Sequence, residues 1–122
     1  MKKIFFWTIL VILWLCPASW AGVKFETLSV NTAIGISSTL ITPTAGDAEY
    51  KREPVAALIG PVETDQIRFR TDGTDPTSSV GHLLQVGQTY VMTNGWQVRN
   101  FKAIKVTNTA SVPVTVLYGP KQ

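Results

Sequence analysis

Apolar and polar residues alternate along most of the chain after residue 21, with turn-forming residues about every ten positions. In Gln66–Thr71, for example, Ile67 and Phe69 alternate with Arg68 and Arg70. Successive side chains of a strand point to opposite faces, so this run predicts a β-strand with one apolar face and one solvated face. No stretch of this part of the chain has the periodicity of a helix.

The last apolar run, Val112–Tyr118, predicts a strand in which Tyr118 ends the core. Pro113 has no N–H to donate to a neighbouring strand, so we expect it at a sheet edge or a strand start. Less regular runs predict the other strands: Val23–Val30, Ile34–Ile41, Val55–Val62, Leu83–Val86, Thr89–Thr93 and Ala103–Thr107. Many short strands at this spacing predict an all-β fold, a single antiparallel β-sandwich of the jelly-roll or Ig-like kind.

Two segments do not follow the strand pattern. Thr42–Pro54 is polar and contains prolines near both ends, which predicts a long loop. Asn94–Phe101 predicts a turn followed by a short helical turn, with Trp96 and Phe101 capping one end of the core.

The first 21 residues predict a secretory signal peptide with a helical apolar segment, and therefore an exported protein. Lys2 and Lys3 precede the apolar stretch Ile4–Leu15, and the segment ends on small residues at Ala21. We expect cleavage after Ala21, which leaves a β-sandwich domain over residues 22–122 that is periplasmic, secreted, or part of a virion or cell surface. The alternative is an uncleaved membrane anchor, but an apolar helix of about 12 residues rises only ~18 Å against a hydrocarbon core of ~30 Å.

Composition excludes several classes of protein. A chain of 122 residues permits one domain. Loss of Lys2 and Lys3 from its eleven basic residues leaves nine against eight acidic ones, a net charge of +1, so nucleic-acid binding is not expected. The only cysteine, Cys16, lies in the leader, which excludes disulfides, thiol catalysis and cysteine-zinc sites in the mature domain.

The most distinctive motif is the turn that follows Arg70. In the structural interpretation, Gly73 supplies a positive φ, Asp72 and Asp75 accept hydrogen bonds from nearby backbone amides, and Pro76 fixes the next turn. In the alternative, the two aspartates and neighbouring threonine oxygens bind a hard cation, although calcium usually takes six or more oxygens. We favour the structural interpretation.

Candidate catalytic groups are few. His82 is the only histidine and is expected to stabilise the turn, so neither a histidine metal cluster nor a cofactor site is predicted. The carboxylate pairs Asp72/Asp75 and Glu49/Glu53 could in principle hydrolyse a glycoside, but no pattern places either pair in a cleft. We therefore expect a protein that is not an enzyme.

Three short motifs resemble small tailed-phage and prophage proteins of about 100 residues. They are the Asp-Gly-Thr-x-Pro-Thr turn at 72–77, the Val-Gly-His step at 80–82 and the Phe-x-Ala-Ile strand at 101–104. The resemblance implies a virion-associated β-sandwich protein. The predicted signal peptide departs from this resemblance, because proteins that assemble into virions in the cytoplasm have no signal peptide. A virus that assembles at the membrane, an exported bacterial copy or a fused export sequence would account for it.

A shorter segment, residues 69–77, resembles the Tyr-Thr-x-Asp-Gly-x-x-Pro segment of Ig-like accessory domains in chitobiase-type secreted enzymes. This resemblance implies a secreted, non-catalytic module. Both resemblances imply a β-sandwich and differ in the partner.

We expect a structural or attachment protein whose partners are copies of itself or other virion or surface proteins. The alternative is a secreted carbohydrate-binding or accessory module. In that case Trp96, Tyr50 and Tyr90 are the side chains that could stack on sugars, although packing in the core is the preferred interpretation of Trp96.

Overall fold

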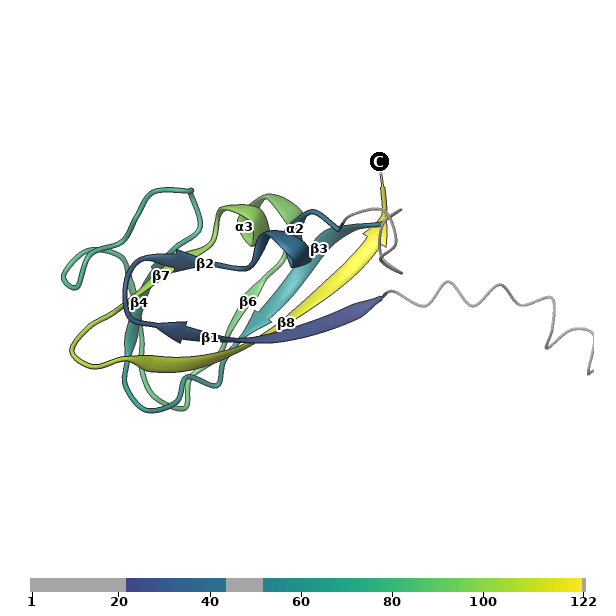
Figure 1. Cartoon of the computed structure of the whole chain (residues 1–122). Coiled ribbons are helices and arrows are strands. Elements are labelled where there is room, and N and C mark those ends of the chain that lie inside the picture. The colour runs from purple at the N-terminus through teal and green to yellow at the C-terminus, as the bar shows by residue number, and fades with distance from the viewer. Residues whose placement is uncertain (1–21, 44–51, 122) are drawn as a thin grey trace, which may run out of the picture.

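The computed structural model describes residues 22–43 and 52–121, so the predicted leader (1–21) and much of the predicted loop lie outside the described residues (Figure 1). The strands are β1 Val23–Val30, β2 Ile34–Gly35, β3 Arg52–Ile59, β4 Ile67–Arg70, β5 His82–Leu84, β6 Tyr90–Met92, β7 Lys102–Lys105 and β8 Ala110–Pro120, and the helices are α2 Ser38–Ile41 and α3 Gly95–Asn100. None of the described helices has the length and apolar character needed to cross a membrane. The chain forms an all-β sandwich, as the sequence predicts.

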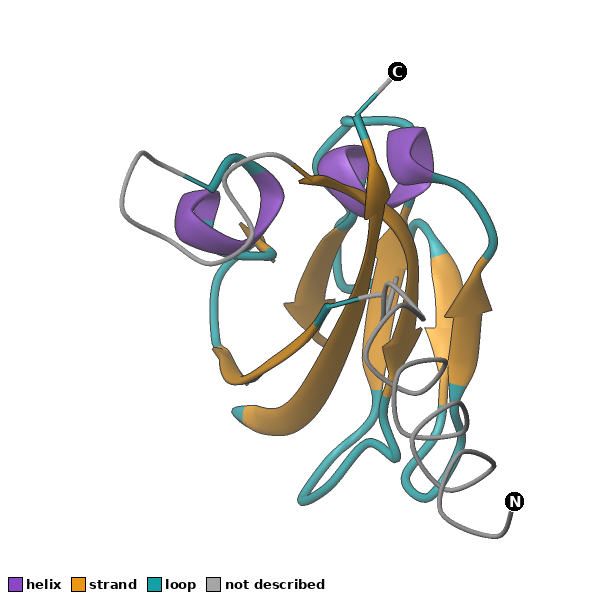
Figure 2. Ribbon diagram, turned by 90° about the vertical axis from the view of Figure 1, so that its right-hand side faces the viewer, coloured by secondary structure: helices purple, strands orange, loops and turns teal. Residues whose placement is uncertain are grey.

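The strands form two four-stranded antiparallel sheets, in the orders β1-β8-β3-β6 and β2-β7-β4-β5. The first strand pairs with the eighth, the second with the seventh, the third with the sixth and the fourth with the fifth. This is one long hairpin folded over onto itself, the strand order of a jelly roll, and not the seven-stranded order of an Ig domain. Both short helices lie on the upper side of the sandwich in Figures 1 and 2.

The core lies between the two sheets and follows the period-two pattern. β8 alternates strictly, and its inward side chains are all buried: Ala110, Val112, Val114, Val116 and Tyr118. On the opposite sheet, Ile67 and Phe69 point inward from β4, as predicted. Phe101 is buried in the core, with its ring centroid 5.8 Å from that of Phe69.

Pro113 lies in a central strand, so its predicted edge position is wrong. β8 pairs with β1 on one side and with β3 on the other. The carbonyl oxygen of Pro113 accepts a hydrogen bond from the N–H of Gly60, immediately after β3 ends. The nitrogen of Pro113 therefore faces the chain beyond the end of β3. The absence of its N–H removes no hydrogen bond between paired residues of the two strands.

The predicted strand Ile34–Ile41 is also wrong over most of its length, because only Ile34–Gly35 forms a strand and Ser38–Ile41 is a turn of helix. Three successive hydroxyl residues, Ser37 to Thr39, favour a turn over an extended ladder. The N–H of Ser37 donates to a carboxylate oxygen of Glu26 (2.8 Å), which fixes the turn beside β1.

The other strands lie close to their predicted positions, β1 with the predicted bounds. β3 is the main exception, because it begins at Arg52, inside the predicted loop, and ends at Ile59, three residues before Val62. A register shift between Pro54 and Ala56 accommodates the proline, which strands tolerate at bulges. Gly60, with φ of 95°, ends the strand.

Candidate functional site

An exposed tryptophan stands over a shallow depression beside α3. Asn94 begins this helix, and its side chain accepts a hydrogen bond from the N–H of Gln97 (2.9 Å). Val98 points from the helix into the core, which leaves Trp96 on the outer side. Trp96 is 60% exposed, so the preferred interpretation of it as a core residue is wrong. A six-residue helix can bury only the narrow stripe that faces the sheet.

The wall of the depression carries one pair of opposite charges. Arg99 of α3 and Glu53 of β3 face each other, with Nη2 and Oε2 3.3 Å apart. Gly95 brings the helix close to β3, since a Cβ there would stand 2.2 Å from the carbonyl oxygen of Pro54. The depression therefore combines an aromatic surface, an amide side chain at Asn94 and a charged pair. Glycan-binding sites use side chains of these kinds.

The other two predicted ligand contacts do not join Trp96. Tyr90 is half-buried on β6, and its ring lies 4.6 Å from the ring of Phe69, centroid to centroid. Tyr90 therefore packs against the core, and only part of its side chain reaches solvent. Tyr50 lies outside the described residues.

The turn after β4 is held by its own charged groups. The guanidinium of Arg70 donates to both carboxylate oxygens of Asp72 (2.5 and 3.2 Å), and Asp72 also accepts from the N–H of Thr74 (3.0 Å). These donors lower the pKa of Asp72 from its ordinary 3.8 to about 2, with the Arg70 hydrogen bond as the largest cause. Gly73 has φ of 80°, as predicted. The N–H of Gly73 donates to the carbonyl of Asn100 (3.0 Å), which ties the turn to the end of α3.

The second aspartate of the motif has a different role from the one predicted. Asp75 accepts from the ammonium of Lys102 on β7 (2.5 Å), and no described backbone amide donates to it. Pro76 is buried, and its ring lies under Gly81. The residues that the structure describes contain no group of three or more His, Cys, Asp or Glu side chains that could hold a metal ion. With Asp72 and Asp75 each paired to a cation, the turn has the geometry of a structural element.

His82 lies at the start of β5, an edge strand, and its ring is exposed with its centroid 5.5 Å from that of Phe69. It lines a depression together with Arg70, Thr71 and Asp72, so it lies beside the turn. Arg68 helps to hold the turn, because its guanidinium donates to the carbonyls of Ser78 and Gly81 (3.0 and 2.9 Å). Of the carboxylates considered for glycoside hydrolysis, Glu53 is paired to Arg99, and Glu49 lies outside the described residues.

A second surface feature is the outer side of the β1-β8-β3-β6 sheet, which we call the outer apolar face. One row of paired residues crosses all four strands: Phe25, Thr115, Leu58 and Val91. A second row of Val23, Leu117 and Ala56 runs beside it. Phe25 is 72% exposed and Val91 is 56% exposed. None of these seven residues is charged, so the face presents apolar and hydroxyl groups to solvent.

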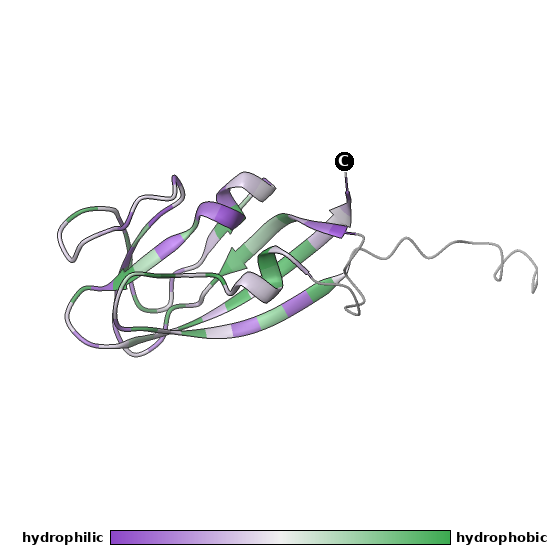
Figure 3. Cartoon of the chain, turned by 45° about the horizontal axis from the view of Figure 1, so that its top comes forward, coloured by the Kyte–Doolittle hydropathy of each residue, from purple (hydrophilic) through white to green (hydrophobic). Residues whose placement is uncertain are grey.

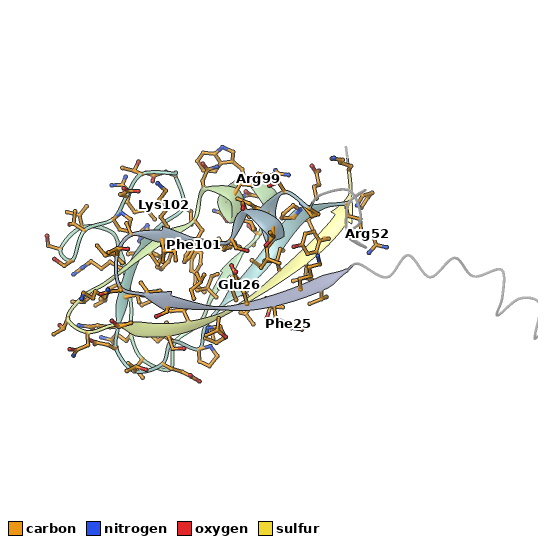
Figure 4. The ribbon with its side chains drawn as sticks, viewed as in Figure 1. Phe25, Glu26, Arg52, Arg99, Phe101 and Lys102 are labelled. Carbon is orange, nitrogen blue, oxygen red and sulfur yellow. The ribbon has the colours of Figure 1, made fainter. Side chains whose placement is uncertain are left out.

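The outer apolar face was not predicted from the sequence, although β1 contains a signal for it. Apolar residues occupy odd positions at Val23 and Phe25 and even positions at Leu28 and Val30. Such a change of phase within one strand places apolar side chains on both sheet faces. Figure 3 shows the alternation along β1, and Figure 4 shows Phe25 and Glu26 on opposite sides of the strand.

Compared with known proteins, the chain matches no protein-family model, no curated protein and no solved structure.

Proposed function

We propose that this chain is an exported, non-catalytic structural or attachment protein that acts by surface contact, either with copies of itself or with other virion or surface proteins. The observation that carries the proposal is the outer apolar face, with Phe25, Leu58 and Val91 exposed in one row. Contiguous apolar surface that is rimmed by polar groups is typical of protein interaction sites.

Several further features favour this function. The leader sequence, with Lys2 and Lys3 before an apolar stretch, favours export. The charged residues of the distinctive turn, Asp72 and Asp75, are paired to Arg70 and Lys102, which favours a role in holding the fold. Jelly rolls form both virion shells and lectins, so the fold agrees with the proposal without deciding the partner.

The proposal is tested by the mass of the protein in solution. The full chain is expressed in a bacterium with its own leader, and native mass spectrometry and sedimentation velocity are run on the periplasmic fraction. We expect a species that begins at Gly22 and forms a closed oligomer at micromolar concentration. A monomer at every concentration, with no binding to another surface protein, would overturn the proposal.

Two matched variants assign the association to the outer apolar face. Val91 lies on this face and is 56% exposed, whereas Val86 lies in the loop between β5 and β6 and is 57% exposed. Val91→Thr should weaken association, because it removes apolar area and keeps the β-branched shape. Val86→Thr, the same change at the same exposure, should have no effect.

A secreted glycan-binding module is the second candidate function, and the exposed Trp96 favours it. Because Trp96 is the only tryptophan after the leader, its emission reports directly on the depression beside α3. In the periplasmic protein, a red-shifted emission that moves to the blue when soluble chitin fragments or other glycans are added would favour this candidate. Arg99→Ala keeps the tryptophan that reports binding, and it should weaken that response if the charged wall contributes. Emission that no glycan changes would count against it.

A further inference from the structure

β1 is an edge strand, and among the residues that the structure describes no strand lies along its outer edge. The N–H of Tyr118 donates to the carbonyl of Gly22 (2.9 Å). This hydrogen bond and the register show which residues of β1 direct their backbone groups toward β8. Alternate residues point the other way, so the N–H and C=O groups of Val23, Phe25, Thr27 and Ser29 face away from β8. Within the described part of the chain, no backbone group pairs with them. An exposed edge of this length is a template for another strand.

The free edge and the outer apolar face are continuous. The four residues with free backbone groups also direct their side chains outward, and Phe25 among them is 72% exposed. A strand that added to β1 would therefore extend the outer face as well as the sheet. The partner that fits must be extended and must carry apolar residues on the same side, and β1 itself meets both conditions.

We propose that β1 pairs antiparallel with β1 of a second copy about a two-fold axis through Phe25, an inference that rests on the proposed function and names its partner. Outward residues must face outward residues across the axis. In the register centred on Phe25, Phe25 faces its own copy, and Lys24 faces Glu26 of the other copy on both sides of the axis. Opposite charges directly across a strand pair stabilise the pairing.

The neighbouring registers lack this complementarity. A register centred on Glu26 sets two carboxylates against each other at the axis, and one centred on Thr27 sets Lys24 against Val30. Glu26 keeps its hydrogen bond from Ser37 in the chosen register, because a carboxylate accepts several donors. Several registers place outward side chains opposite outward side chains. Among them, the pairing of opposite charges favours the register centred on Phe25.

The pairing joins two four-stranded sheets into one. Residue pairs 23–27, 25–25 and 27–23 each exchange two backbone hydrogen bonds, about six in all. The result is a closed, isologous dimer whose outer apolar faces form one surface. Phe25, the most exposed of the large apolar side chains, then packs against its own copy.

Single cysteines test the register in the full chain that carries Cys16→Ser. Residues at the axis stand about 5.5 Å apart between Cα atoms, within the range of a disulfide, whereas the Cα of Thr27 stands about 14 Å from that of its own copy. We expect Phe25→Cys to form a linked dimer on mild oxidation, and Thr27→Cys and Ser29→Cys to form none. An equal mixture of Val23→Cys and Thr27→Cys, both of which keep Phe25, should form a linked heterodimer.

Charge exchange supplies an independent measurement. Lys24→Glu and Glu26→Lys should each weaken the dimer by about 2- to 30-fold, the range for two cross-strand pairs, and the double exchange should restore it. Circular dichroism of each variant shows whether the fold is retained. An oligomer that forms neither the Phe25→Cys link nor the mixed link would overturn the β1 pairing and leave the proposed function standing. A wild-type monomer would overturn the β1 pairing, and it would overturn the proposed function only if the protein also bound no other surface protein.

Discussion

The hydroxyl of Tyr118 joins the longest strand to a helix that is distant in sequence, and its removal should measurably destabilise the domain. The hydroxyl donates to the carbonyl of Leu40 in α2 at 2.6 Å, and both residues are buried. Tyr118→Phe keeps the ring and deletes only the oxygen. A buried carbonyl left without its donor costs about 1–3 kcal/mol. For a domain of about 100 residues, this corresponds to a drop in Tm of roughly 5–15 °C.

The assay is urea unfolding followed by circular dichroism, with Tm measured on the same samples. We expect Tyr118→Phe to lower the denaturation midpoint without changing the slope, because the surface exposed on unfolding is unchanged. Tyr90→Phe is the matched control, since Tyr90 is half-buried and no described hydrogen bond involves its hydroxyl. Equal effects below about 0.5 kcal/mol in both variants would refute the reasoning.

Further variants test local features. A methyl at Gly95 would stand 2.2 Å from the carbonyl of Pro54, so Gly95→Ala should lower Tm more than Gly87→Ala, where the φ of 83° is strained but no atom lies within 4 Å. Two backbone N–H donors, that of Asn108 first, lower the pKa of Asp65 below its ordinary 3.8. The stability this adds is present above about pH 4 and is lost as the pH falls through the lowered pKa. Asp65→Asn should therefore reduce the fall in Tm between pH 5 and pH 2.

The sequence by itself determined the fold class and most strand positions. Strict alternation in Gln66–Thr71 and Val112–Tyr118 identified the inward residues, because the two-residue period of a strand is a local property of the backbone. The Asn94–Phe101 helical turn and the positive φ at Gly73 were also correct, since capping and turn preferences act over a few residues.

The tertiary structure alone decided which strands are central and which surfaces are free. Pro113 lies in a central strand because its missing N–H faces the end of β3, a coincidence of two segments about 50 residues apart. Trp96 is exposed because α3 buries Val98 instead, and Arg99 meets Glu53 only when the helix packs on β3. The outer apolar face likewise exists only where four strands align in register, and such alignments depend on long-range pairing that no local pattern encodes.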